Sequence, residues 1–306
     1  MNLQSMDYVI TTAEEKSITK AAERLHITQQ TLSAHICALE EELGCQLFVR
    51  HVPLEITFAG REFLKYAHSI QNEVKGLRRT FDEITGEERG ILKVGVTHVR
   101  GEIILPEMIM DFSRKHPGIN LKIIEDANDV LIQKLKKGEI DLCISDFATE
   151  QSKIQYVDLY REKVVFVCQK QLFHKIYGEE ADEVLRRIEQ EADFKILARC
   201  PMLISHAMDI AGRYARKWIA TFDDIPQIKV EASNVELLLR LCRSGLGGCF
   251  CPDIILRDVF SREQMKDMLV ISLGKESEYD IRIGWKDDWR VISAFVESAK
   301  RKTKYV

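Results

Sequence analysis

Amide and hydroxyl side chains gather in one short stretch near the N-terminus. The run TQQTLSAH, residues 28–35, sets polar residues among apolar ones at helical spacing. Gln can bond adenine through two atoms at once, and Ser or Thr hydroxyls can bind a phosphate or a base edge. The stretch therefore predicts a helix whose exposed face reads the major groove of double-stranded DNA. The residues of this predicted reading face are Thr28, Gln29, Gln30, Thr31, Ser33 and His35.

A simpler interpretation stays open for each of these side chains, because the polar face of an amphipathic helix is often only solvated. The charge balance gives no help in choosing. Residues 1–57 hold four Lys or Arg against eight Asp or Glu, so the segment is acidic. Attraction to phosphates must then come from a few well-placed basic residues and from helix N-termini.

Short helices are expected to position the reading face. An apolar stripe from Leu3 to Ala13 predicts a first helix, and Ser17 is the expected N-cap of a second helix through Leu25. Thr28 should cap a third helix that ends at Gly44. Two β-like runs, residues 45–50 and 54–57, follow with a turn at 51–53. This order predicts a winged helix-turn-helix over residues 1–58.

A heptad pattern follows in residues 59–88, which we assign to a linker helix. Its apolar residues advance by alternating steps of four and three, which is typical of a two-stranded coiled coil. The residues of this predicted dimerisation seam are Phe63, Ala67, Ile70, Val74, Leu77, Phe81 and Ile84. The alternative is one amphipathic helix that packs on its own domain. Residues 86–90, GEERG, are the expected hinge.

Strands and helices alternate through residues 89–306, which predicts an α/β domain with parallel sheets covered on both faces. Strand-like runs include ILKVGV, DLCIS, VVFVC, MLIS, GCFC and YDIRIGW. A helix is expected from about Glu102 to Lys115. We assign lobe I to residues 91–162 and 268–306 and lobe II to residues 163–267, with a cleft between them.

Polar residues follow several of these strands, where the ligands of such folds bind. The candidate effector-binding residues are Thr97, His98, Arg100, Ser145, Phe147, Ser205, His206 and Ser233. Thr97 at a helix N-terminus with Arg100 nearby would suit a carboxylate or another small anion. The alternative is that Thr97 only caps its helix and that Arg100 pairs with a surface carboxylate such as Glu102.

Composition limits the other functions. The 306 residues are too many for one ordinary core, and 45% hydrophobic with 30% charged residues is typical of a globular protein. No apolar run is long enough to span a bilayer, so we expect a cytoplasmic chain with no membrane partner. The eight cysteines contain no CxxC pair, and Cys249 and Cys251 are interpreted as buried thiols. We expect no metal and no cofactor.

The ordered runs ITKAAERLHITQQTLSAHICALEEELGCQLFVR, ITFAG, ILKVGV, LKKGEIDLCIS and SGLGGCFCP resemble LysR-type transcriptional regulators. The resemblance covers nearly the whole chain. It implies a winged helix-turn-helix, a linker-helix dimer and an effector domain of the type II periplasmic-binding-protein fold. It also implies a tetramer, built as a dimer of dimers, that binds partly palindromic DNA.

The resemblance assigns DNA contacts to Gln29, Gln30 and Ser33, places Arg50 at the base of the wing and puts Lys20 near a phosphate. Three features depart from the family pattern. Ala34 stands where a basic residue is frequent, Gln30 stands where proline is common, and the wing HVPLEI lacks the usual arginines. These departures bear on affinity and on operator sequence more than on DNA binding itself.

The sequence thus predicts a DNA-binding regulator controlled by a small molecule between two lobes. Two alternatives remain at this stage. One is an enzyme of the two-lobed fold, for which His98, His206 and Asp146 lack any catalytic spacing. The other is a DNA-binding repressor with a vestigial pocket.

Overall fold

The N-terminal helices begin and end where the sequence predicts. The computed structural model describes residues 1–51, 53–85, 89–147 and 154–303. The first elements are α1 (Leu3–Glu15), α2 (Ile18–Arg24), α3 (Gln29–Leu43), β1 (Phe48–Val49), β2 (Glu55–Ile56) and α4 (Phe58–Thr85). Ser17 caps α2, and the hydroxyl of Thr28 accepts the backbone N–H of Thr31 at 3.1 Å. Gly44 ends α3 with a φ of 69°, a left-handed conformation that glycine adopts at low cost.

A small core holds these helices and the wing together. Ala21 and Ala22 are buried against Leu32 and Ile36, so the small side chains let α2 and α3 approach closely. Strands β1 and β2 pair antiparallel, as expected for a wing. A Cβ on Gly60 would lie 2.2 Å from the carbonyl oxygen of Leu47, so α4 begins directly against the wing. The predicted turn at 51–53 and hinge at 86–90 extend outside the described residues.

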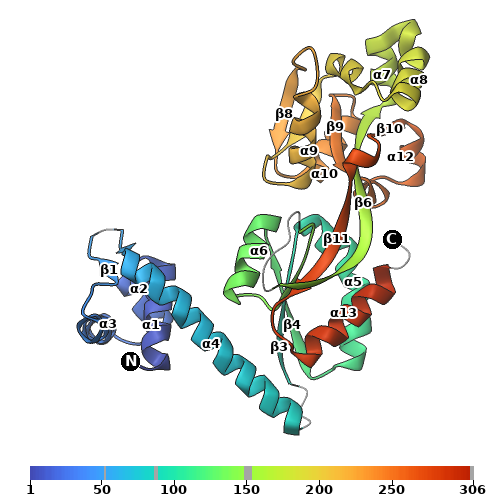
Figure 1. Ribbon diagram of the computed structural model, residues 1–306. Coiled ribbons are helices and arrows are strands. Elements are labelled where there is room, and N and C mark those ends of the chain that lie inside the picture. Colours follow the sequence, from blue (N-terminus) through green and yellow to red (C-terminus); the bar gives the residue numbers. More distant parts are fainter. Residues whose placement is uncertain (52, 86–88, 148–153, 304–306) are drawn as a thin grey trace. The chain divides into compact units, whose positions relative to one another are not determined.

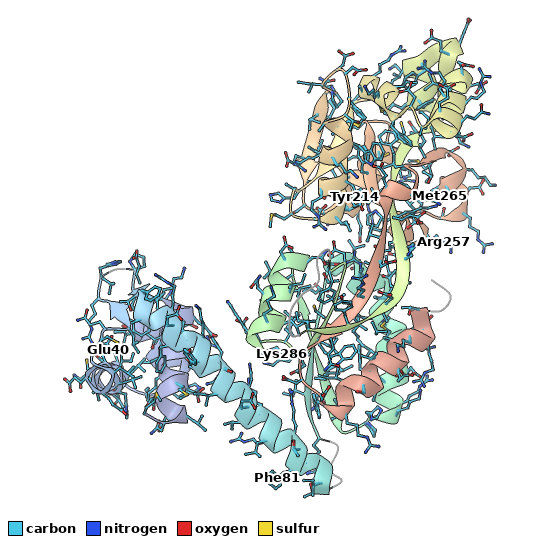
Figure 2. All side chains as sticks on the ribbon, in the orientation of Figure 1. Glu40, Phe81, Tyr214, Arg257, Met265 and Lys286 are labelled. Atoms are coloured by element: carbon cyan, nitrogen blue, oxygen red, sulfur yellow. The ribbon has the colours of Figure 1, made fainter. Side chains whose placement is uncertain are left out.

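The long helix α4 has two parts that differ in burial. Its first turns pack on α1, where Ala67 is 1% exposed beside Met6 and Ile10, with Phe63 in the same cluster. This part of the predicted seam, with Phe63 and Ala67, thus packs within the subunit. Further along, Leu77 and Phe81 are each 58% exposed, and Phe81 is labelled near the end of α4 in Figure 2.

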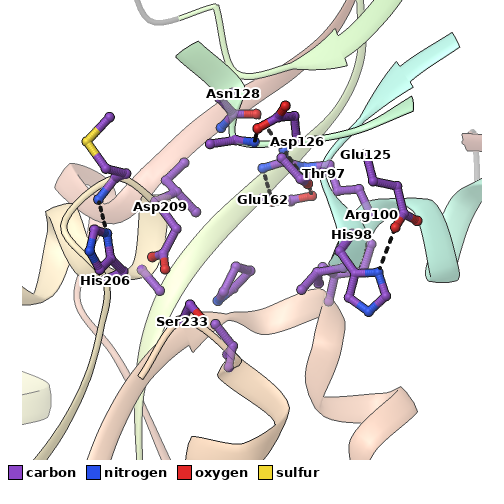
Figure 3. Close-up of a pocket in the computed structure, with 18 residues that line it drawn as sticks. Thr97, His98, Arg100, Glu125, Asp126, Asn128, Glu162, His206, Asp209 and Ser233 are labelled. Atoms are coloured by element: carbon purple, nitrogen blue, oxygen red, sulfur yellow. Dashed lines mark hydrogen bonds and ion pairs between the residues drawn. The ribbon is translucent and has the colours of Figure 1, made fainter. Parts of the chain in front are cut away.

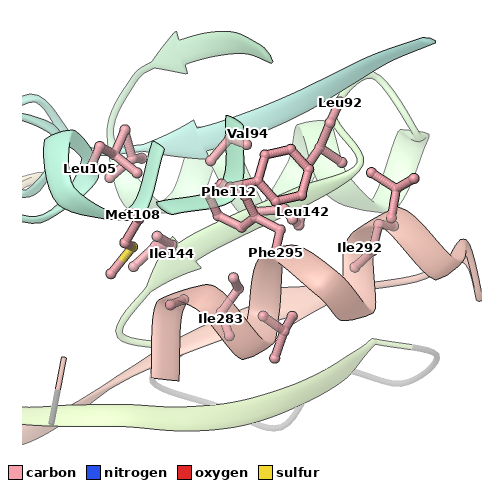
Figure 4. Packing of buried hydrophobic residues seen from close by; sticks show 14 of the residues in the cluster. Leu92, Val94, Leu105, Met108, Phe112, Leu142, Ile144, Ile283, Ile292 and Phe295 are labelled. Atoms are coloured by element: carbon pink, nitrogen blue, oxygen red, sulfur yellow. The ribbon is translucent and has the colours of Figure 1, made fainter. Parts of the chain in front are cut away.

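The chain forms two compact units, of which the second comprises most of residues 91–306. Its lobe I contains β3 (Gly90–Val96), α5 (His98–Lys115), β4 (Ile119–Glu125), α6 (Asn128–Lys137), β5 (Leu142–Ser145), β11 (Glu278–Trp285) and α13 (Arg290–Lys302). Helix α5 thus begins at His98, four residues before the predicted start at Glu102. Leu92 and Val94 of β3 face α5 and α13, where the rings of Phe112 and Phe295 meet edge to face at 5.3 Å (Figure 4).

Lobe II is likewise built from strands and the helices that pack on them. Its elements are α7 (Lys170–Tyr177), α8 (Ala181–Glu191), β7 (Met202–Ser205), α9 (Ile210–Ile219), β8 (Ile228–Ala232), α10 (Val235–Arg243), β9 (Gly248–Pro252), α11 (Leu256–Val259), α12 (Arg262–Lys266) and β10 (Met268–Ser272). Short 3-10 turns lie at Gly178–Glu180, Phe194–Arg199, Asp253–Ile255 and Lys275–Ser277. Cys249 and Cys251 are buried in its core, as expected.

The two lobes share a long strand, β6 (Gln155–Gln169), which runs with β11 from one lobe toward the other (Figure 1). The strand order is β4-β3-β5-β11-β6-β9-β7-β8, and β10 also pairs with β6. Pairs β3–β5, β7–β8 and β7–β9 are parallel, but the pairs made by β6 are antiparallel, so the sheet is mixed rather than parallel throughout. Because β10 pairs with the lobe II half of β6, residues 268–272 belong to lobe II, not to lobe I as predicted.

Candidate functional site

One face of α3 carries an open stripe of polar side chains. Gln29, Ser33 and Cys37 follow one another at intervals of four residues and therefore share a face. Gln29 and Gln30 are exposed, and in the described part of the chain their amides have no protein partner. Cys37, half-buried on the same stripe, was not among the predicted reading residues. Gln29 and Gln30 are therefore open to solvent at the N-terminal end of α3.

The other predicted residues of this region have local partners or lie to the side. The hydroxyls of Thr28 and Thr31 bond to each other at 2.8 Å, so they complete the cap of α3. His35 packs its ring against Tyr8 of α1 at 5.1 Å. Since residues two apart on a helix do not share a face, His35 projects away from the Ser33 stripe. Lys20 is exposed on α2.

Arg50, at the end of β1, reaches back to α3. Its Nη2 donates to Cys37 Sγ at 2.8 Å and to Glu40 Oε2 at 3.1 Å. These bonds raise the pKa of the Arg50 guanidinium, with the Cys37 contact as the larger cause. The guanidinium therefore stays charged and lies beside the stripe of α3.

The second site is a cavity of about 400 Å³ in the effector domain, at the start of α5, α6, α9 and α10 (Figure 3). Five of the eight predicted effector residues line it, namely Thr97, His98, Arg100, His206 and Ser233. Its apolar wall consists of Val99, Ala127, Met208, Ile210, Ala211, Val235, Pro252 and Ile254. A volume of this size matches that of small-molecule sites.

Arg100 is buried, and its partner is not the one that the sequence suggested. Its Nε and Nη2 donate to the two carboxylate oxygens of Glu162 at 3.1 and 3.3 Å. Glu162 also accepts hydrogen bonds from Tyr160 at 2.8 Å and from Tyr279 at 2.5 Å. The alternative pairing of Arg100 with Glu102 is wrong. Because Glu162 already neutralises Arg100, this side chain is not an unpaired cation waiting for an anion.

The charged groups His98, Asp126 and Asp209 of the cavity also have hydrogen-bond partners. His98 Nδ1 lies 3.1 Å from Glu125, and this hydrogen bond raises the pKa of His98 above its ordinary value. Asp126 accepts from Lys134 at 2.9 Å. Burial raises the pKa of the Asp209 carboxyl, which caps α9 by accepting the Gly212 N–H at 2.6 Å.

Three predicted effector residues do not line the cavity. Ser145 is fully buried and its hydroxyl donates to Asp146. Phe147 is 1% exposed and packs in the core beneath α6. The hydroxyl of Ser205 donates to the carboxylate of Asp209, which itself lines the cavity. Asp146 instead pairs with Arg213 of α9 and faces a separate hollow of about 390 Å³.

The family of the chain follows from two sequence matches. Residues 3–61 match the family described as bacterial regulatory helix-turn-helix protein, lysR family. Residues 85–296 match the LysR substrate binding domain. The chain belongs to the LysR family of transcriptional regulators. The family resemblance and the two-part fold predicted from the sequence are thereby confirmed, and the enzyme alternative falls, because the matched domains belong to regulators.

Curated relatives agree with this assignment, and solved structures share the fold. The regulator CzcR of Bacillus subtilis (strain 168) is 32% identical over 255 residues, 83% of this chain and 81% of CzcR. An uncharacterized regulator of the same organism, YcgK, is 27% identical over 90% of this chain and 86% of its own length. CbnR in complex with its target DNA has a TM-score of 0.62 at 22% identity, covering 99% of this chain and 100% of CbnR. A full-length OxyR variant from Pseudomonas aeruginosa has a TM-score of 0.68 at 21% identity, covering 98% and 95%.

Proposed function

We propose that this LysR-type regulator binds partly palindromic double-stranded DNA as a dimer of dimers, under the control of a small molecule held in the effector-domain cavity at the start of α5. The observation that carries the DNA-binding part is the open stripe on α3. Two glutamine amides without protein partners in the described part of the chain stand at the N-terminal end of the helix, where recognition helices meet base edges. Thr28, Thr31 and His35 contribute less directly, since they brace the helix.

The exposed part of α4 supports dimerisation. Ile70, Leu77, Phe81 and Ile84 are 37%, 58%, 58% and 72% exposed, although all four are apolar. Large apolar side chains at heptad spacing stay exposed at a cost unless a partner helix covers them. A second copy of α4 offers the matching seam. Assembly of two such dimers rests on the family alone.

The cavity fits a small molecule with an apolar body and one anionic group. Thr97 precedes α5 but makes no side-chain cap bond, so the first backbone N–H groups of this 18-residue helix remain available. Asp209 and Asn234 already cap α9 and α10. Ser233, another lining residue, adds a hydroxyl donor. This arrangement favours a carboxylate even though Arg100 is neutralised.

Arg100 offers a route by which the bound molecule influences the strand β6, which connects the two lobes of the effector domain. It contacts Thr97 and Asn128 in the cavity wall, each at 3.4 Å, and bonds to Glu162. Glu162 lies where β6 passes from its pairing with β11 to its pairing with β9. A molecule that binds one lobe arrangement better than the other shifts the population toward it. The altered arrangement would change the spacing of the DNA-binding units.

The cellular compartment follows from the partner. A DNA-binding regulator of a bacterial family acts where the chromosome lies, in the cytoplasm. No helix in the described ranges is both long and apolar enough to cross a bilayer.

The test has two stages. First, the protein selects from a random duplex library; enrichment of an interrupted palindrome is expected, and no enrichment at low salt would contradict the proposal. Second, the melting temperature is measured with a panel of small carboxylates and with their primary amides as matched controls. Stabilisation by at least one acid and not by its amide supports the anion site. Stabilisation by amides alone would exclude it, and a shift that changes with the duplex present would establish the coupling.

A further inference from the structure

Glu40 stands apart from the other acidic residues of the DNA-binding unit. It is 8% exposed, and it is the one buried charged residue in the described part of residues 1–85. Its neighbours Glu41 and Glu42 on α3 are exposed. Burying a carboxylate is unfavourable unless hydrogen bonds compensate for the lost water. The question is therefore which groups hydrogen-bond to the buried carboxylate of Glu40.

Those partners all belong to the wing. Glu40 Oε1 accepts the backbone N–H groups of Leu47 at 2.7 Å and Phe48 at 3.2 Å, at the start of β1. Oε2 accepts Nη2 of Arg50 at 3.1 Å. A single side chain of the recognition helix thus fixes both the backbone of the first wing strand and the guanidinium at its end. Figure 2 labels Glu40 within this unit.

The contact with Cys37 fixes the orientation of the Arg50 guanidinium. Cys37 lies one turn beyond Ser33 on the open stripe of α3, and Arg50 Nη2 bonds to its sulfur at 2.8 Å. The guanidinium is held between Cys37 on the stripe and Glu40 at the edge of the core. Its side chain is still 49% exposed, so its remaining N–H groups can reach a phosphate.

We propose that Glu40 is a positioning residue for DNA binding: its buried carboxylate locks the wing strand to α3 and holds Arg50 alongside the reading stripe, ready for a phosphate. The inference rests on the proposed function, in which Arg50 contacts DNA. The effect on DNA affinity that it predicts is opposite to the effect expected from net charge alone. Removal of a negative charge from an acidic unit should strengthen attraction to DNA, whereas removal of the charge of Glu40 weakens binding.

The experiment compares Glu40→Gln with Glu41→Gln in the full-length protein. Both variants lose one negative charge from the same helix, but only the first loses the ionic bond to Arg50. The amide introduced by Glu40→Gln keeps an oxygen for the wing backbone while it turns N–H groups toward the guanidinium. The probe is the duplex that the wild-type protein enriches from a random library. Glu40→Gln is expected to bind about tenfold more weakly, the effect of one charge-assisted hydrogen bond, and Glu41→Gln equally well or more tightly.

A double-mutant cycle with Arg50→Ala separates positioning from a general loss of structure. If Glu40 acts through Arg50, adding Glu40→Gln to Arg50→Ala causes no further loss of affinity. The salt slope of log K should also become shallower by about two in both single variants, because each of the two units of a bound dimer loses one phosphate contact. Additive losses in the cycle, or equal affinities of Glu40→Gln and Glu41→Gln, would overturn the inference.

Two further comparisons distinguish failure of the proposed Arg50 contact from failure of the proposed Glu40 role. If Arg50→Ala binds DNA as well as wild type, the proposed role of Arg50 fails; if Arg50→Ala weakens binding and Glu40→Gln does not, only the positioning role fails. Should Glu40→Gln melt below the assay temperature, Cys37→Ala replaces it in the same cycle. Loss of the contact between Arg50 and the Cys37 sulfur is expected to cost about threefold, and that loss must disappear in the Arg50→Ala background. Persistence there would refute the positioning of Arg50.

Discussion

The ion pair behind the cavity gives the sharpest stability prediction. Arg100 and Glu162 have side chains only 4% and 1% exposed, and they are joined through both carboxylate oxygens. The substitution Glu162→Gln keeps the shape of the side chain but leaves the Arg100 charge without its counterion in the protein interior. The hydroxyls of Tyr160 and Tyr279 lose a charged acceptor at the same time.

The magnitude follows from burial. Removing one partner of a buried pair costs about 3–5 kcal/mol, because the other charge stays desolvated and uncompensated. Surface pairs are worth about 0–1 kcal/mol by contrast. Glu276, which is 72% exposed and lies 3.3 Å from Lys217, supplies a matched control in the same domain. Glu276→Gln should therefore change the free energy of unfolding by less than about 1 kcal/mol.

Urea unfolding followed by tryptophan fluorescence isolates the relevant domain. The chain has three tryptophans, Trp218, Trp285 and Trp289, and all of them lie in the effector domain. The emission therefore reports unfolding of that domain in the full-length protein. The free energy of unfolding, extrapolated to water, is expected to fall by about 3–5 kcal/mol in Glu162→Gln.

A loss below about 1 kcal/mol would refute the argument, since it would mean that water reaches the pair. A second variant tests the cause. Replacing both Arg100 and Glu162 by Met removes the two charges together, so it should recover a large part of the stability lost in Glu162→Gln. If the double variant is the less stable of the two, uncompensated charge is not the reason for the loss.

Three further predictions concern the other parts of the chain. Leu77→Asp puts a charge on the exposed seam of α4, so light scattering should show a shift toward monomer; an unchanged mass would contradict the coiled coil. Glu125 raises the pKa of His98 above its ordinary 6.5, so an NMR titration should show this pKa falling in Glu125→Gln. Because the pKa is higher in the folded state, protonation of His98 stabilises the folded domain. This contribution is complete below pH 6.5 and is lost as the pH rises through the raised pKa. Gln30→Ala should reduce discrimination at one base pair of the selected duplex by about 1–3 kcal/mol, whereas uniform weakening at all positions would indicate a contact to phosphate.

The helix ends and the periodic patterns of the chain could be predicted from the sequence. Ser17, Thr28 and Gly44 mark helix ends because capping depends on residues only a few positions away. The heptad spacing of α4 and the alternation of strands and helices are equally local patterns. What they could not indicate is which partner covers an apolar face. Phe63 therefore looked like part of an intermolecular seam, although it packs on α1.

Long-range pairing limited the prediction of the cavity. Glu162 lies 62 positions from Arg100, so the sequence offered the nearby Glu102 as the partner instead. Phe147 follows a strand as expected, but its backbone has a φ of 36° and its ring lies in the core beneath α6. Glu40 was hidden in a different way. In the run EEE nothing distinguishes the buried carboxylate from two solvated ones until the wing strand is placed against α3.

The acidity of the DNA-binding unit leads to one more quantitative expectation. Of the four Lys or Arg in residues 1–57, Arg24 is engaged with Glu14 and Glu15, and Lys20 and Arg50 are the proposed phosphate contacts of each unit. A dimer on two half-sites would then neutralise about four phosphates and show a slope of log K against log salt near about −3.6. Affinity measured on the selected duplex across a salt series gives this slope directly. A slope steeper than about −6 would mean that other basic residues carry the binding, because two cations per unit cannot release so many counterions.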